Sequence, residues 1–188
     1  WSSDVCSSDL TGRNFYSVDL RALPTGAAWD LGRRSAELLL DLHLQQEGEP
    51  LRQLALSVWG TSTMRNGGED IAQALALLGI RPVWDGPSRR LVDLELIPLA
   101  QLGRPRVDVT LRISGLFRDA FPQLVAWMNR ATAMVAAATD ESEHDNPLAA
   151  AASRDGHAFR VYGSAPGAYG AGLQGRSEEH TSELQSQF

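Results

Sequence analysis

Hydrophobic residues first recur at helical spacing over a segment that runs from Trp29 to His43. Residues three or four positions apart share one face of an α-helix, so one face of this segment is predicted to be buried. Thr25 is a suitable N-cap before the pattern, and Gly48 is a suitable stop after it. The sequence therefore predicts a helix between Thr25 and Gly48.

Two short apolar runs flank a second helical pattern. LALSVWG (54–60) and IRPVW (80–84) are each typical of a buried strand. Between them, TSTMRNGG (61–68) is predicted to be a polar turn and EDIAQALALLG (69–79) a helix. The apolar residues of that helix recur at helical spacing: Ile71, Leu75 and Leu78. Strand, helix and strand in this order predict a parallel βαβ unit with a right-handed crossover.

Two further strands and a long helix complete the pattern. Residues 91–99 and 107–113 are predicted strands, and apolar residues alternate along the second. Residues 121–139 are predicted to form a long helix, and an acidic loop follows it. The 54–58 strand is expected to be central, with its aliphatic side chains buried beside Val83 and the 107–113 strand. The predicted fold class is α/β, with a small, mostly parallel sheet flanked by helices.

The two ends of the chain do not follow this pattern. One DNA string encodes WSSDVCSSD at the start, and its reverse complement encodes RSEEHTSEL near the end. We interpret residues 1–10 and 176–188 as translated sequencing adapter and residues 11–175 as the genuine α/β segment. The adapter-derived residues, including Val5, Leu10 and Leu184, are expected not to pack against the core.

Charge and composition change once these ends are set aside. The chain has 17 basic and 23 acidic residues, of which the two ends hold 1 and 5, so the remainder is nearly neutral with 16 and 18. Every basic residue is arginine, which excludes a Walker-type phosphate lysine and a Schiff-base lysine. Cys6 lies in the foreign stretch and gives no evidence for a disulfide or metal site.

Composition also argues against two classes of partner. The arginine clusters at 89–90 and 104–106 are small and balanced by acids, which disfavours a nucleic-acid face. No apolar run approaches the roughly 20 residues that a membrane span requires. We expect a soluble, cytoplasmic protein.

Two polar segments follow predicted strands, where ligands of α/β sheets usually bind. Their candidate binding residues are Trp59, Thr61, Arg65, Glu69 and Asp70 after the first strand, and Arg112, Ser114, Arg118 and Asp119 around the end of the fourth. Structural roles remain an alternative for each group. Acids such as Glu69 and Asp70 suit a helix N-terminus in any protein, and Arg118 can pair with Asp119 or bind a carbonyl.

A resident metal site is not expected from these residues. His43 falls on the inner or boundary face of its helix, and His144 and His157 lie in loops without a partner at ligand spacing. The glycine-rich GSAPGAYGAG (163–172) matches neither common phosphate-binding pattern and is interpreted as a turn-rich segment.

Several longer stretches carry a family resemblance. They include NFYSVD, LSVWGTSTMRNGGEDIAQALALLGIRPVWD, LGRPRVDV, SGLFRD and VYGSAPGAYGAGLQ. In this order they resemble the large subunit of ATP-dependent cobaltochelatase, the CobN type, and the related H-type large chain of magnesium chelatase. The resemblance covers residues 11–175 and implies a slice from the interior of a much larger multidomain subunit.

The resemblance implies a part in metal insertion during cobalamin biosynthesis. The substrates would be Co²⁺ and the tetrapyrrole hydrogenobyrinic acid a,c-diamide, and ATP would be hydrolysed on partner subunits of the AAA+ and metal-binding-domain type. The fragment alone is expected to be inactive. Arg65, Arg112 and Arg118 would suit the carboxylates of the substrate. No residue is assigned as catalytic.

Three alternatives remain open. The first is the H-type large chain of a magnesium chelatase, which would take Mg²⁺. The second is a non-catalytic tetrapyrrole-binding relative without partner ATPases. The third is a structural subdomain remote from the tetrapyrrole.

Overall fold

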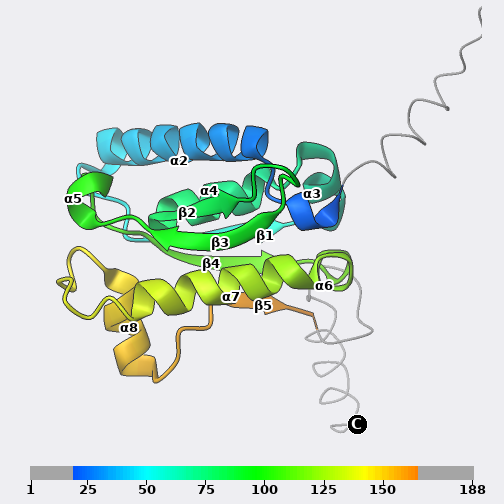
Figure 1. The fold of residues 1–188 in the computed structure, drawn as a ribbon. Helices are drawn as coiled ribbons and strands as arrows, with labels where there is room; N and C mark the ends of the chain where they lie inside the picture. Colours follow the sequence, from blue (N-terminus) through cyan, green and yellow to red (C-terminus); the bar gives the residue numbers. More distant parts are fainter. Residues whose placement is uncertain (1–18, 165–188) are drawn as a thin grey trace, which may run out of the picture.

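A computed structural model of the chain describes residues 19–164 (Figure 1). The expectations for the two ends, including Val5, Leu10 and Leu184, and for most of the glycine-rich 163–172 segment lie outside the described residues. The elements follow in the order η1 (Leu20–Ala22), α2 (Gly26–Glu47), β1 (Gln53–Val58), α3 (Gly60–Asn66), α4 (Glu69–Leu78), β2 (Ile80–Trp84), β3 (Leu91–Leu96), α5 (Leu99–Leu102), β4 (Asp108–Ile113), α6 (Gly115–Ala120), α7 (Pro122–Ala136), α8 (Pro147–Asp155) and β5 (Val161–Gly163).

The first predicted helix is confirmed with both of its caps. The Ala28 N–H donates to Thr25 Oγ1 at the start of α2, 3.1 Å away. Gly48 ends the helix with φ at 74°, and its N–H donates to the Leu44 carbonyl. Only glycine adopts this left-handed conformation without a steric penalty, which is why the helix stops there.

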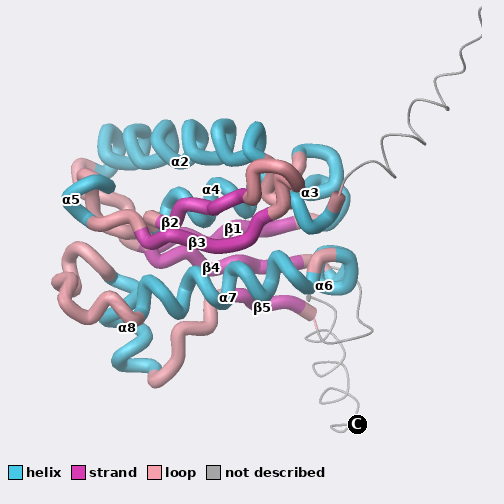
Figure 2. The backbone as a smooth tube through the Cα atoms, viewed as in Figure 1, coloured by secondary structure: helices cyan, strands magenta, loops and turns pink. Residues whose placement is uncertain are grey.

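The predicted α/β class is also confirmed. Strands β1, β4 and β5 form a sheet in which β4 is central and both pairings are parallel. Leu54 lies opposite Val109, and Val58 lies opposite Ile113. Helices flank this sheet in Figures 1 and 2.

The predicted βαβ unit is wrong. Strand β2 does not join β1; it pairs antiparallel with β3 in a separate two-stranded sheet, with Ile80 opposite Leu96. A turn beginning at Asp85 joins the two strands, and Ser88 donates its N–H and its hydroxyl to the Asp85 carboxylate. Pro82 lacks an N–H, which suits a strand of a small hairpin better than the interior of a large sheet. The turn residues therefore outweighed the strand–helix–strand order.

The expected place of β1 also needs correction. It lies at the edge of the sheet instead of in its centre. Leu54 and Leu56 are therefore only half-buried, although Val58 is buried as predicted. The predicted turn at 61–68 is largely the helix α3, and the polar segment after β4 is the helix α6. Ser114 caps α6 through its side chain, whereas Trp59 at the N-cap of α3 makes no side-chain cap hydrogen bond, so only α6 carried a local start signal.

The core is built around α4, whose side chains Ile71, Leu75 and Leu78 are buried as predicted. Helix α4 contacts α2 and α7, strands β1 and β4 of the sheet, and strand β2 of the hairpin. A helix with packed neighbours on so many sides is expected to be apolar nearly all round. In Figure 1, α2, α4 and α7 run beside one another across the molecule.

Sequence reasoning did not predict α8 or β5. Asn146 caps α8 by accepting the Ala149 N–H, and Pro147 occupies the first turn. Asparagine followed by proline is a recognised start signal for a helix. Strand β5 has only three residues, too few for a periodic pattern.

Candidate substrate site at the carboxyl edge of the sheet

The two predicted polar segments meet at the carboxyl ends of β1 and β4. The Ser114 N–H donates to the Val58 carbonyl at 3.0 Å. The Ser114 hydroxyl in turn accepts the Gly60 N–H at 3.3 Å and the Phe117 N–H at 3.2 Å. Ser114 is thus the N-cap of α6 and ties that helix to the start of α3.

Helices α3 and α6 approach each other closely at Gly60. A Cβ atom on Gly60 would lie 2.8 Å from Leu116 Cγ and 3.0 Å from the Phe117 nitrogen. Beside this contact, Trp59 is 48% exposed and Leu116 is 41% exposed. The edge of the sheet therefore presents apolar side chains to solvent next to polar ones, a combination that suits a large ring with a polar periphery.

Arg118 is held in a defined position at this edge. Its Nε donates to Asp119 Oδ1 at 2.8 Å and its Nη2 to Asp119 Oδ2 at 3.1 Å. Its Nη1 donates to the Ser164 carbonyl, which follows β5. Arg118 therefore makes both of the structural contacts that were considered for it, the ion pair with Asp119 and a hydrogen bond to a carbonyl. Pairing of this kind also orients a guanidinium for a ligand.

Three other candidates are exposed on the elements that begin or end near this edge. Thr61 lies in the first turn of α3, Arg65 in its last turn, and Arg112 near the end of β4. Within residues 19–164 neither Arg65 nor Arg112 has an ion-pair partner. Their charges are therefore available to an anionic ligand.

Glu69 and Asp70 begin α4, where acids complement the helix dipole. Asn66 Oδ1 accepts the Gly68 and Glu69 N–H groups at 3.0 and 3.3 Å. Burial raises the pKa of the Asp70 carboxyl, and a hydrogen bond with Asn66 partly offsets this effect. The preceding glycines pack on the segment before α2, because a Cβ on Gly68 would lie 3.2 Å from Pro24 Cα.

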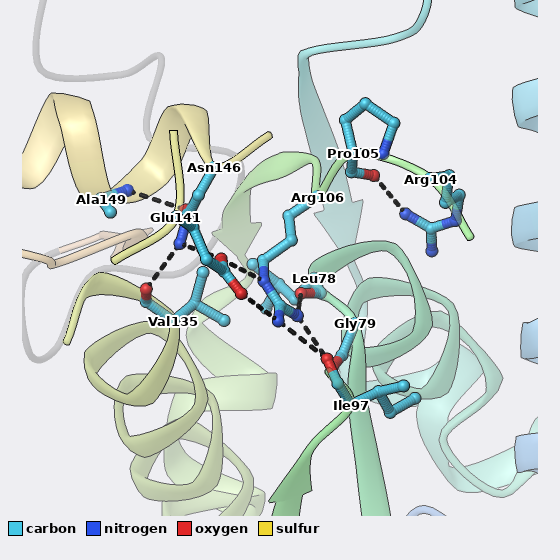
Figure 3. Close-up of polar contacts among 10 residues, drawn as sticks. All are labelled: Leu78, Gly79, Ile97, Arg104, Pro105, Arg106, Val135, Glu141, Asn146 and Ala149. Atoms are coloured by element: carbon cyan, nitrogen blue, oxygen red, sulfur yellow. Dashed lines mark hydrogen bonds and ion pairs between the residues drawn. The ribbon is translucent and has the colours of Figure 1, made fainter. Parts of the chain in front are cut away.

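A second polar cluster lies at the amino-terminal end of β4, whereas the candidate site lies at its carboxyl end (Figure 3). Arg106 is fully buried, and its guanidinium donates to Glu141, 2.7 Å away through both Nε and Nη2. Its remaining hydrogen bonds reach the carbonyls of Leu78, Gly79 and Ile97. Arg104 also donates to carbonyls of the last turn of α4. Both arginines thus satisfy carbonyls at a helix C-terminus.

Another buried ion pair joins β4 to the segment before β5. Arg160 donates to both carboxylate oxygens of Asp108, at 2.7 and 3.0 Å, and both side chains are almost fully buried. The hydrogen bond to Asp108 raises the pKa of Arg160 further above its usual range.

No group of three or more histidine, cysteine, aspartate or glutamate side chains in the described part of the chain could hold a metal ion. Among the same residues, no helix is long and apolar enough to cross a membrane.

The family of the chain follows from a model of the CobN/Magnesium Chelatase family, which matches residues 10–188. The chain belongs to this family. It is 54% identical to the aerobic cobaltochelatase subunit CobN of Pseudomonas aeruginosa over 94% of its length. It is 37% identical to the H-type chain of the magnesium chelatase of Cereibacter sphaeroides over 87% of its length.

A solved structure shares the fold. The catalytic subunit of cobaltochelatase from Mycobacterium tuberculosis superimposes with a TM-score of 0.80 at 46% sequence identity, over 88% of this chain. The chain spans only 15% of that structure and 15% of the Pseudomonas relative. The predicted family and the predicted larger size of its members are both confirmed.

Proposed function

We propose that this chain supplies part of the tetrapyrrole-binding surface of a cytoplasmic metal chelatase large subunit. The observation that carries the proposal is the meeting of two strand ends at Ser114. That contact places Trp59, Leu116 and Arg118 at the carboxyl edge of one parallel sheet. Ligands of α/β sheets bind at this edge, so the position supports a substrate role.

The chemistry of the edge fits a carboxylated macrocycle. Trp59 offers an aromatic face on which a flat ring can stack. Arg65 and Arg112 can form bidentate hydrogen bonds with peripheral carboxylates, and Arg118, whose Nε and Nη2 donate to Asp119, adds a positive charge beside them. The Thr61 hydroxyl and the carboxylates of Glu69, Asp70 and Asp119 supply further polar contacts, while the buried Ser114 hydroxyl holds α3 and α6 together.

The metal that we propose as substrate is Co²⁺, inserted into hydrogenobyrinic acid a,c-diamide. Higher identity to CobN than to the magnesium chelatase relative supports cobalt over Mg²⁺. Insertion requires loss of ring N–H protons, distortion of the ring and removal of water from the cation. Glu69, Asp70 and Asp119 are the carboxylates near these segments that could accept such protons.

We infer that ATP is hydrolysed on partner subunits of the AAA+ and metal-binding-domain type. This segment contains no lysine and so contributes no P-loop of its own. Hydrolysis elsewhere would drive insertion through conformational coupling to the large subunit. The 188-residue chain alone is expected neither to hydrolyse ATP nor to insert metal.

The test uses the full-length subunit encoded by the gene that contains this chain. Arg65→Ala and Arg118→Ala are each expected to weaken tetrapyrrole binding or slow cobalt insertion roughly ten- to a hundredfold, because each removes a charge-assisted hydrogen bond. Binding is measured by quenching of tetrapyrrole fluorescence, and insertion is measured with the partner ATPases present.

Arg81→Ala is the matched control, since Arg81 forms an exposed ion pair with Glu95 on the hairpin. Unchanged affinity and rate in folded Arg65→Ala and Arg118→Ala would reject this site and leave the segment as scaffold. Insertion of Mg²⁺ in preference to Co²⁺ would instead favour the magnesium alternative. Tetrapyrrole binding without insertion by the complete assembly would favour the non-catalytic relative.

A further inference from the structure

Helix α2 lies beside α4, beyond the edge strand β1 of the three-stranded sheet. It packs against α4, and α4 contacts β1 and β4. The contact with α4 is close, because a Cβ on Gly32 would lie 2.7 Å from Ala72 Cβ. Among the described residues the sheet ends at β1 (Figure 2). The helical layer is thus one helix wider than the strands that it covers.

One side of α2 faces the hairpin. The ring of Trp29 lies 6.5 Å from the ring of Trp84 on β2, in a T-shaped arrangement. At about 3.6 residues per turn, Leu31, Leu38 and Leu42 fall on the opposite side of the helix from Trp29. The leucines thus lie on the side of α2 away from the hairpin, and the α4 helix beside α2 contacts both the hairpin strand β2 and the sheet strands β1 and β4.

Those leucines are exposed although their spacing is that of a buried face. Leu31, Leu38 and Leu42 are 52%, 70% and 50% exposed. Their separations of seven and four residues place them in a single row along the helix. A contiguous exposed row of leucines marks a contact surface.

The outer edge of β1 is also unpaired within residues 19–164. The Arg52 carbonyl, just before β1, accepts the Asp108 N–H of β4, and the Val58 carbonyl accepts the Ser114 N–H just after β4, so alternate residues of β1 point toward β4. The N–H and C=O groups of Gln53, Ala55 and Ser57 therefore point away from it, and all three residues are exposed. Strand β1 carries no charge, proline or bulge that would protect an open edge.

We propose that a further β-strand of the same subunit polypeptide, from outside residues 19–164, pairs with the outer edge of β1 and packs beneath the leucine row of α2. Two independent features fit the same occupant. A strand would pair with the outward N–H and C=O groups of β1, and its apolar side chains would cover Leu31, Leu38 and Leu42.

The source of the strand follows from the size of the family members. The chain covers 15% of the Pseudomonas relative, so a full-length polypeptide offers many segments in cis. A strand supplied in cis is present at high effective concentration, which favours it over a second copy or a separate protein. Its inward residues are expected to be apolar, to match the leucines, and parallel pairing would bury both of its faces.

Photo-crosslinking in the full-length subunit tests the occupant. A benzoylphenylalanine placed at Leu38 is expected to give an intramolecular crosslink to a strand segment outside residues 19–164, identified by mass spectrometry. The matched control is the same residue at Leu44, which is 49% exposed but lies away from the leucine row. Crosslinks from position 38 to a second copy or to another protein, or no crosslink, would overturn the proposal.

Substitution provides a second readout on the same protein. Leu38→Asn should increase proteolytic cleavage within α2 by about tenfold or more, because a leucine buried against the strand is lost. Leu44→Asn should leave the cleavage rate unchanged. Hydrogen exchange at Ala55 should be slow in the full-length subunit. Equal cleavage of the two variants together with fast exchange at Ala55 would contradict the proposed strand.

Discussion

Arg106 and Arg118 lie at opposite ends of β4 and have opposite environments. Arg106 is fully buried, and its guanidinium donates to three carbonyls and to Glu141. Arg118 is partly exposed and shares an accessible edge with Trp59. Both arginines belong to stretches that resemble the chelatases, LGRPRVDV and SGLFRD.

The difference shows that a shared motif does not by itself identify a binding site. LGRPRVDV ends a helix and joins it to the hairpin and to the loop after α7, so its arginines have a structural role. SGLFRD also caps a helix, but it leaves charged and apolar groups accessible at the carboxyl edge. Substitution of Arg106 should therefore lower the stability of the fold, whereas substitution of Arg118 should weaken tetrapyrrole binding.

The largest loss of stability is expected at the buried end. Arg106→Ala should lower the free energy of unfolding of the chain by about 3–5 kcal/mol, because it leaves Glu141 and three carbonyls without their partner. Chemical denaturation measures the change. Arg154→Ala is the control, since Arg154 and its partner Glu143 are well exposed, and it should change stability by less than about 1 kcal/mol. Equal effects would contradict the structural role of Arg106.

Gly60→Ala should have the next largest effect. The new methyl group would meet the Phe117 backbone nitrogen as well as Leu116, so α3 and α6 must separate, at a cost of about 1–3 kcal/mol. Gly26→Ala is the control, because no atom lies within 4 Å of the place that its new methyl group would occupy. Thermal unfolding compares the two variants. A Gly60→Ala protein as stable as Gly26→Ala would show that the helices do not meet as described.

Arg118→Ala should change stability little while it weakens binding. The Arg118–Asp119 ion pair is partly accessible to solvent, and such a pair contributes roughly 0–1 kcal/mol. The expected loss in tetrapyrrole affinity is larger, because a charge-assisted hydrogen bond to the substrate is removed. Denaturation of the variant beside its wild type measures the change in stability. A loss of several kcal/mol would place Arg118 with Arg106 as a structural residue.

The smallest effect is expected at Asp19, whose carboxylate accepts a hydrogen bond from Arg90. That bond, together with the Arg21 N–H, lowers the pKa of the Asp19 carboxyl. A lowered pKa contributes stability above the unfolded pKa, and this contribution is lost as the pH falls through the folded pKa. Asp19→Asn should thus be slightly less stable than wild type at neutral pH, and the difference should vanish once the pH falls below the folded pKa of Asp19. A difference that grows at low pH would contradict this account.

Sequence patterns predicted those parts of the fold that local signals determine. Thr25 and Gly48 define the ends of α2, and the alternating residues of β4 identify a buried strand. Strand pairing was not predictable in the same way, because it depends on the turn at Asp85 and on contacts distant in sequence. The Asp–Gly–Pro sequence of that turn was the available signal for a hairpin.

The candidate site was predictable in position but not in detail. Parallel strands place their carboxyl ends together, which brought Ser114 to Gly60. The exposure of Leu116 and the carbonyl partner of Arg118 depend on tertiary packing, so no periodic pattern predicts them. The same holds for the Asp108–Arg160 pair, whose members are far apart in the sequence.

Tetrapyrrole affinity of the full-length Trp59→Ala variant tests the central claim most directly. Trp59 and Phe159 are both exposed aromatic residues, but Trp59 follows β1 at the carboxyl edge and Phe159 precedes β5 at the other end of the sheet. Fluorescence quenching should give a Kd about five- to a hundredfold weaker for Trp59→Ala, from loss of one stacking contact, and an unchanged Kd for Phe159→Ala. An unchanged Kd for Trp59→Ala, or an equal loss in both variants, would contradict a substrate site at the carboxyl edge.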